Sequence, residues 1–224
     1  MTNPEEPEQK QSDIFQKFYA LPAEKQERII NAAMQEFLIG YKKASTDNIV
    51  REAGISKGIL FHYFGTKENL YSFLIEYAIE LVVQEYIGLI NVTQTDILES
   101  IWQFSLLKKD LAMRFPVVFD FMVSVYVDPS PKSEDASKSL AKVMQTQAKI
   151  QQDVYANADL SLFRDEINPA TAIQIIQLTL QGYSQAKISA APGQSLGHLS
   201  RENYDSFLEE FQEMLNVFRM CFYK

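Results

Sequence analysis

The stretch 45–67, STDNIVREAGISKGILFHYFGTK, constrains this chain most, because its pattern is that of two short helices joined by a tight turn. Ser45 or Thr46 can accept a hydrogen bond from first-turn N–H groups and so cap a helix. Gly54 can adopt the positive φ that ends this helix, and Ser56 can cap a second one. Two short helices joined by a glycine-containing turn form a helix-turn-helix, whose second helix enters the major groove of DNA.

The second helix of the motif has two distinct sides when its residues are placed about 100° apart around the helix axis. Leu60 and Phe64 then lie close together and are predicted to be buried. The opposite side presents Gly58, Ile59 and His62. A small residue, a residue that can touch a thymine methyl and a polar ring suit a surface that reads base edges.

Cations, aromatic rings and a further cap surround that surface. Lys57 can donate to phosphate or base acceptors, and Tyr63 can donate to phosphate. Phe61 and Tyr63 flank the exposed side, and the alternative is that they pack on neighbouring helices. Thr66 and Lys67 start the next helix, where N–H groups and a cation favour phosphate.

The net charge is unevenly distributed. The whole chain has a net charge of −8, whereas residues 41–67 carry five Lys or Arg against two Asp or Glu. A small basic unit of charge +3 therefore sits in a chain whose remainder carries −11. This distribution favours a local phosphate-binding surface over general affinity for polyanions.

Outside the motif, the sequence predicts a series of helices separated by polar breaks. Residues 1–13 are predicted to be a disordered lead-in, and Ile14–Leu21 a short helix or packed arm. Charged residues 108–110 mark a corner, and Pro116 kinks or restarts the apolar stretch around it. The other helices are predicted over about residues 22–39, 67–90, 95–107, 111–127, 133–158, 169–191 and 200–222.

The sequence AGISKGILFHYF at 53–64, followed by KENL at 67–70, resembles the signature of the TetR family of transcriptional regulators. The resemblance extends over about residues 24–82, and it implies an all-α protein. It also implies a homodimer, most often a repressor, that a small molecule releases from a pseudo-palindromic operator. The positions expected to contact DNA are Thr46, Ser56, Lys57, Gly58, Ile59, His62, Tyr63 and Lys67, together with Phe61, where the family often has Tyr.

We therefore expect three parts in the chain. Residues 1–21 form a flexible or loosely packed arm. Residues 22–82 form a three-helix DNA-binding domain, with the helix-turn-helix motif at 45–64. Residues 83–224 form a C-terminal helical domain that binds a ligand and makes the dimer.

The last two predicted helices carry the candidate dimer surface. Apolar residues recur between Tyr204 and Phe222 at spacings of three and four, which makes a stripe too apolar to be left in water. The resemblance implies that two such helices from each subunit form a four-helix bundle, and the alternative is that the stripe faces its own domain's core. The predicted interface residues are Ile176, Tyr183, Phe207, Phe211, Leu215 and Phe218.

Aromatic and methionine residues in the C-terminal domain suggest a pocket for an apolar or flat ligand. Such residues also commonly fill a core, which is the alternative for each of them. The acidic charge of this domain favours a neutral or cationic ligand over an acyl-phosphate one, so the expected effector is a small apolar or cationic molecule. The candidate pocket residues are Trp102, Phe119, Met122, Tyr126, Met144 and Tyr183.

The residues favour a DNA-binding regulator over an enzyme. Cys221 is the sole cysteine, the two histidines have no metal-ligand spacing, and no P-loop or G-x-G-x-x-G is present. We therefore predict no catalytic residue, no metal and no cofactor. Without an apolar leader or membrane span, the expected location is the cytoplasm. The expected partners are double-stranded operator DNA, a second copy of the chain and a small molecule; the alternative is a small-molecule-binding protein or enzyme that does not bind DNA.

Overall fold

The computed structural model describes residues 15–128, 130, 132–189 and 201–224, and over these residues the fold is helical, as predicted. The predicted lead-in at 1–13, the end of the helix near 191 and the cap at Ser200 lie outside the described residues. A helical turn covers residues 15–19. The elements that follow are α2 (Ala23–Phe37), α3 (Thr46–Ala53), α4 (Lys57–Phe64), α5 (Lys67–Glu85), η1 (Ile87–Leu89), α6 (Ile97–Arg114), α7 (Pro116–Val127), α8 (Glu134–Ala156), η2 (Leu160–Leu162), α9 (Pro169–Ser189) and α10 (Arg201–Phe222).

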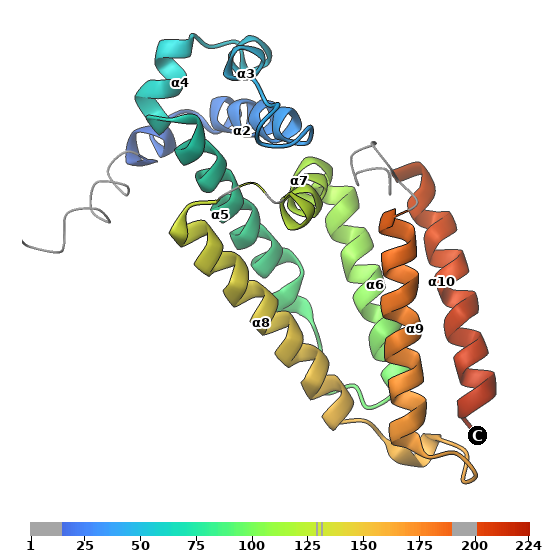
Figure 1. The fold of residues 1–224 in the computed structure, drawn as a ribbon. Helices are drawn as coiled ribbons and strands as arrows, with labels where there is room; N and C mark the ends of the chain where they lie inside the picture. The colour runs from blue at the N-terminus through green and yellow to red at the C-terminus, as the bar shows by residue number, and fades with distance from the viewer. Residues whose placement is uncertain (1–14, 129, 131, 190–200) are drawn as a thin grey trace, which may run out of the picture.

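The helices form a small head and a larger body (Figure 1). The head holds α2, α3 and α4, and α5 runs from it into the body beside α8. On the other side of the body, α6 packs against α10, and α9 lies with them. In the described part of the chain, no helix is both long and apolar enough to cross a lipid bilayer.

The helix boundaries differ from the prediction at two places. The charged residues 108–110 were predicted to mark a corner, but α6 continues through them to Arg114. Leu111 and Ala112 are buried next to these charges, so the apolar side of the helix is unbroken. The charges are accommodated by partners on neighbouring elements: Lys109 pairs with Asp205 of α10, and the Lys108 ammonium lies 5.8 Å from the centroid of the Tyr86 ring. Pro116 instead starts α7 at its first position, where a missing N–H costs nothing. The helix predicted to reach residue 90 ends as α5 at Glu85 and continues as the 3₁₀ turn η1.

The turn at residues 15–19 belongs to the core of the head. Phe18 is completely buried, and its ring centroid lies 5.0 Å from that of Phe64 and 5.2 Å from that of Phe73. Phe15 adds a contact to Phe73 at 4.9 Å. The packed arm that the sequence allowed is therefore present, and it joins the last residue of α4 to the side of α5.

A second link joins the head to the body. The backbone N–H of Tyr41, between α2 and α3, donates to Oδ2 of Asp128 at the end of α7 over 2.9 Å. The other carboxylate oxygen accepts the N–H of Ser130 over 2.8 Å. Burial alone would raise the pKa of Asp128, but these hydrogen bonds and the charge of Lys132 outweigh it and lower the pKa. The carboxylate is thus held ionised between the two parts of the molecule.

Candidate functional site

The helix-turn-helix forms as its capping residues predict. The Ser45 hydroxyl accepts the N–H of Asp47 at the start of α3, and the Ser56 hydroxyl accepts the N–H of Ile59 at the start of α4. Gly54 ends α3 with φ of 63°, in the left-handed region that glycine occupies without strain. These caps fix the turn that sets the angle between α3 and α4.

The two sides of α4 have the predicted burial. Leu60 and Phe64 are each only 1% exposed, and both lie in the core of the head. Gly58, Ile59 and His62 are on the exposed side. The geometry is therefore that of a helix anchored by one side and open along the other. Its side chains suit contact with base edges, a role that stays a prediction.

Long-range hydrogen bonds fasten α3 to α2. Nε of Arg28 donates to the carbonyl oxygen of Ala53 over 2.8 Å, at the end of α3. Oε1 of Glu36 accepts the N–H of Ser45 over 2.8 Å and the side-chain amide of Asn48 over 3.1 Å, at its beginning. Both ends of α3 are thus fastened to α2, so the helix that precedes the recognition helix cannot easily rotate.

Two exposed cations of the helix-turn-helix are already paired with carboxylates: Arg51 with its neighbour Glu52, and Lys57 with Asp47. Nζ of Lys57 lies 2.9 Å from Oδ1 of Asp47 on α3, and both side chains are well exposed. Lys42, Lys43 and Arg51 are also exposed. A phosphate approaching Lys57 must therefore displace a carboxylate that belongs to the protein.

Lys67 and the two aromatic flanks are less open than predicted. Nζ of Lys67 donates to the carbonyl oxygen of Ala44 over 2.6 Å and lies 4.7 Å from the centroid of the Tyr41 ring. The predicted phosphate contact would have to compete with these interactions, because the ammonium is directed into the loop before α3. Phe61 and Tyr63 are half-buried, and the Tyr63 ring packs edge-on against Phe18 at 6.1 Å. Thr46 is half-buried, while Ser56 and Gly58 are exposed.

The apolar stripe of α10 is covered by its own chain. Phe211, Leu215 and Phe218 are between 5% and 8% exposed, and Ile176 of α9 is fully buried with them against Ile97 of α6. The stripe was expected to be too apolar to be left in water, and α6 and α9 already remove most of it from water. Phe207 and Tyr183 are half-buried, and the Tyr183 hydroxyl donates to Glu210 over 3.0 Å.

Other apolar side chains of α9 and α10 do face solvent. Ile175 and Leu178 on α9 are 43% and 61% exposed, and Val217 and Met220 on α10 are 49% and 66% exposed. Among the described side chains of α9 and α10, these four are the exposed large apolar residues, and the predicted interface residues Tyr183 and Phe207 are half-buried.

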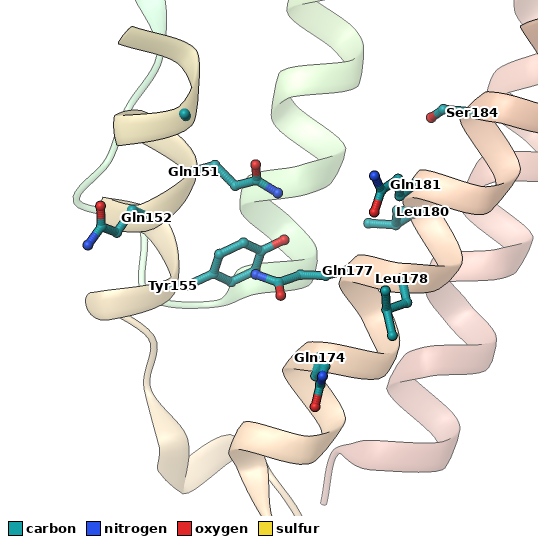
Figure 2. A pocket seen from close by; sticks show the side chains of 10 residues that line it. Gln151, Gln152, Tyr155, Gln174, Gln177, Leu178, Leu180, Gln181 and Ser184 are labelled. Carbon is teal, nitrogen blue, oxygen red and sulfur yellow. The ribbon is translucent and has the colours of Figure 1, made fainter. Parts of the chain in front are cut away.

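A hollow with a volume of about 790 Å³ separates α8 from α9 (Figure 2). Its residues, which define the α8–α9 hollow, are Ala148, Gln151, Gln152, Tyr155, Gln174, Gln177, Leu178, Leu180, Gln181 and Ser184. They include none of the six predicted pocket residues. Met122 is buried in the core, Trp102 and Phe119 are half-buried, and Tyr126 and Met144 are 42% and 54% exposed. The hollow was not predicted from apolar and aromatic residues, because five of its ten lining residues are glutamines.

No metal centre is apparent in the part of the chain that the structure describes, where no three His, Cys, Asp or Glu side chains are grouped to hold an ion. Cys221 is exposed and unpaired with another cysteine.

Most of the head and the start of α5 are similar in sequence to a known protein family. Residues 29–72 match the family described as "Bacterial regulatory proteins, tetR family". No curated protein sequence matches the chain.

The whole fold is similar to three solved structures of low sequence identity. A TetR family transcriptional regulator from Chloroflexus aurantiacus J-10-FL has a TM-score of 0.62 and 17% identity, with 93% of this chain and 98% of that chain covered. A putative tetR family transcription regulator from Shewanella sp. PV-4 has a TM-score of 0.55 and 19% identity, covering 89% and 98%. A gamma-butyrolactone receptor described as ArpA-like has a TM-score of 0.52 and 17% identity, covering 84% and 96%. The helix-turn-helix region of this chain therefore belongs to the TetR family, and the whole chain has the fold of TetR family transcriptional regulators.

Proposed function

We propose that this protein is a homodimeric transcriptional repressor that binds a pseudo-palindromic operator through α4 and leaves it when a small molecule binds the body. The observation that carries the proposal is the geometry of α4. The helix is anchored by Leu60 and Phe64, capped by Ser56 and open along Gly58 and His62. No catalytic role is proposed, because family members are regulators that bind DNA.

In this proposal the exposed side of α4 lies in the major groove. His62 and Lys57 donate to base or phosphate acceptors, and Ile59 contacts a thymine methyl. Gly58 lets the helix approach the DNA closely, because it has no side chain. Thr46 and Tyr63 contact the flanking phosphates, and Lys67 does so after exchanging its bond to the Ala44 carbonyl for one to phosphate.

The dimer forms through the exposed apolar residues of α9 and α10. Ile175, Val217 and Met220, which lie outside the hollow between α8 and α9, supply apolar area that is costly to leave in water. In such a dimer, operator binding requires the two copies of α4 to lie about 34–36 Å apart or slightly more, the separation of successive major grooves on one face of DNA.

Two connections carry the effect of the small molecule to the head. The first is α5, which carries Phe73 against Phe64 of α4 and ends in the body. The second is the hydrogen bond between Tyr41 and Asp128, which fixes α7 to the loop after α2. A ligand that moves α7 or α5 changes the separation of the two recognition helices, by an amount limited by its differential affinity for the two conformers.

Selection from random duplex DNA tests the proposal. The full-length protein should retain inverted repeats, and its affinity should fall by several orders of magnitude between about 50 and 200 mM salt if six or more phosphates are contacted. The double variant Lys57→Ala with His62→Ala should lose this binding while keeping its thermal unfolding midpoint. Lys138→Ala, which removes an exposed cation of α8, serves as the matched control.

Two outcomes would contradict the proposal. One is the absence of any retained DNA at low salt and without added ligand. The other is operator binding by the folded double variant that equals that of the wild type. The second function considered from the sequence, a helical small-molecule-binding protein without DNA affinity, would give the first outcome.

A further inference from the structure

The polar side chains of the α8–α9 hollow form two facing rows. On α9, Gln174, Gln177 and Gln181 are three and four residues apart, which places them on one side of the helix. On α8, Gln151 and Tyr155 are four residues apart and share a side in the same way. Figure 2 shows Gln151 and Tyr155 directed from α8 toward α9, with Gln177 directed back toward α8. A molecule in the hollow would therefore meet amide groups on both sides.

These side chains are available for hydrogen bonding. Within the residues that the structure describes, no hydrogen bond joins the amide of a lining glutamine or the Tyr155 hydroxyl to another residue. Each glutamine amide offers one acceptor oxygen and two N–H donors, and the tyrosine hydroxyl can do either. The hollow thus presents many donors and acceptors that the protein itself does not use.

The lining disfavours the other classes of occupant. None of its ten side chains carries a formal charge, so an ion would lose its hydration without gaining a countercharge. An apolar molecule, or the apolar side of a helix from a second copy, would cover the amides and leave their polar groups without partners. Apolar contact is limited to Ala148, Leu178, Leu180 and the ring of Tyr155, while five glutamines and Ser184 supply the rest of the lining.

We propose that the α8–α9 hollow binds an uncharged small molecule that carries several hydroxyl, carbonyl or amide groups, held between Gln151 and Tyr155 of α8 and Gln177 and Gln181 of α9. The volume of about 790 Å³ fits such a molecule. The binding site itself does not depend on the proposed function. Only the consequence of binding rests on the proposed function, in which this molecule is the effector that releases the protein from its operator. This uncharged, polar ligand differs from the apolar or cationic effector expected from the sequence.

Probes of matched length separate the ligand classes. Adipamide is uncharged with an amide at each end, adipate has the same length with two negative charges, and 1,6-diaminohexane has two positive charges. Benzene represents an apolar ligand. Ligand-observed saturation-transfer NMR on the full-length protein should detect adipamide with a Kd of the order of 1 mM, as expected for about ten non-hydrogen atoms. Adipate, the diamine and benzene should bind at least about tenfold more weakly. Tighter binding of any of these three than of adipamide overturns the proposal.

Variants in the hollow locate the bound probe. The double variant Gln177→Met with Gln181→Met keeps side-chain length but removes two amides, and it should weaken adipamide binding by about tenfold or more. Gln212→Met, which changes an exposed amide of α10 outside the hollow, should leave the affinity unchanged. Gln177→Lys should raise the affinity for adipate, because it adds the missing countercharge. Unchanged adipamide affinity in the double variant, with its thermal midpoint preserved, overturns the assignment.

The DNA assay is separate from the binding assay. Adipamide binding that depends on Gln177 and Gln181 supports the proposed site even if operator affinity does not change, in which case the effector part of the proposed function fails alone. Operator binding with no adipamide binding overturns the ligand proposal and leaves the DNA-binding role in place. Side-chain amide signals of the hollow that change with protein concentration alone would show that a second copy fills it, which also overturns the proposal.

Discussion

The hydrogen bond between Tyr41 and Asp128 gives a sharp prediction about communication between head and body. The two oxygens of Asp128 accept N–H groups from Tyr41 over 2.9 Å and from Ser130 over 2.8 Å. In Asp128→Asn, one oxygen becomes an NH₂ group, which cannot accept either N–H. One of the two hydrogen bonds must therefore be lost, although the size and shape of the side chain are kept.

The expected magnitude follows from the charge of the acceptor. A hydrogen bond to a charged group contributes about 1.5–3 kcal/mol, so Asp128→Asn should lower the free energy of unfolding by about this amount. If the Tyr41 bond is the one lost and it orients the head for DNA, operator affinity should fall by between about tenfold and a hundredfold. Urea unfolding and gel shifts at fixed salt measure the two effects. Asp165→Asn is the matched control, since it removes the same charge from an exposed pair with Lys224.

The same carboxylate predicts a dependence on pH. The pKa of Asp128 is lower in the folded protein than its ordinary value of 3.8, so its stabilising contribution is complete above that value and is lost as the pH falls through the folded pKa. The difference in unfolding free energy between wild type and Asp128→Asn should be constant from about pH 7 to 5 and shrink below about pH 4. A difference near zero at pH 7, or one that persists undiminished at pH 3, would refute the reasoning.

Three further predictions concern the head and the dimer. Lys57→Ala should lower operator affinity and reduce the slope of log affinity against log salt by about 2, which is about 1 for each subunit of the dimer, with Lys138→Ala as control; an unchanged slope would place Lys57 away from phosphate. Phe18→Ala should lower the free energy of unfolding by about 3–5 kcal/mol, measured in urea, because its ring is completely buried; a loss below about 1 kcal/mol would mean that residues 15–19 are not part of the core. Val217→Asp should convert the dimer to a monomer in sedimentation and abolish operator binding, whereas Leu89→Asp, at a similarly exposed apolar position of η1, should remain dimeric; a dimeric Val217 variant would contradict the proposed surface.

Local chemistry made the helix-turn-helix predictable from the sequence. Ser56 and Gly54 specify a start and an end through hydrogen bonds and backbone angles that involve only a few neighbouring residues. The burial of Leu60 and Phe64 follows from helical periodicity over a single turn. The same reasoning fails at residues 108–110, because a neighbouring helix can pair such a charge, as Asp205 of α10 pairs Lys109, while the apolar side of α6 continues.

Features made by residues far apart in the chain could not be predicted in this way. The sequence shows that α10 has an apolar stripe, but not that α6 and α9 cover it, since periodicity does not identify the neighbour. The bond from Tyr41 to Asp128 joins positions 87 residues apart. The α8–α9 hollow could not be predicted because glutamines on a helix usually face water. These glutamines line a hollow only because a second helix lies opposite them.

The ion pair between Lys57 and Asp47 has a consequence for how the protein would search a genome. Surface pairs of this kind are worth only about 0–1 kcal/mol, so a correctly placed phosphate can replace the carboxylate at little cost. On DNA where α4 does not fit, the carboxylate remains a competitor for the lysine, and a dimer contains two such competitors. We expect Asp47→Asn to lengthen the residence time on unrelated DNA more than on the operator, which would slow target location while raising overall affinity.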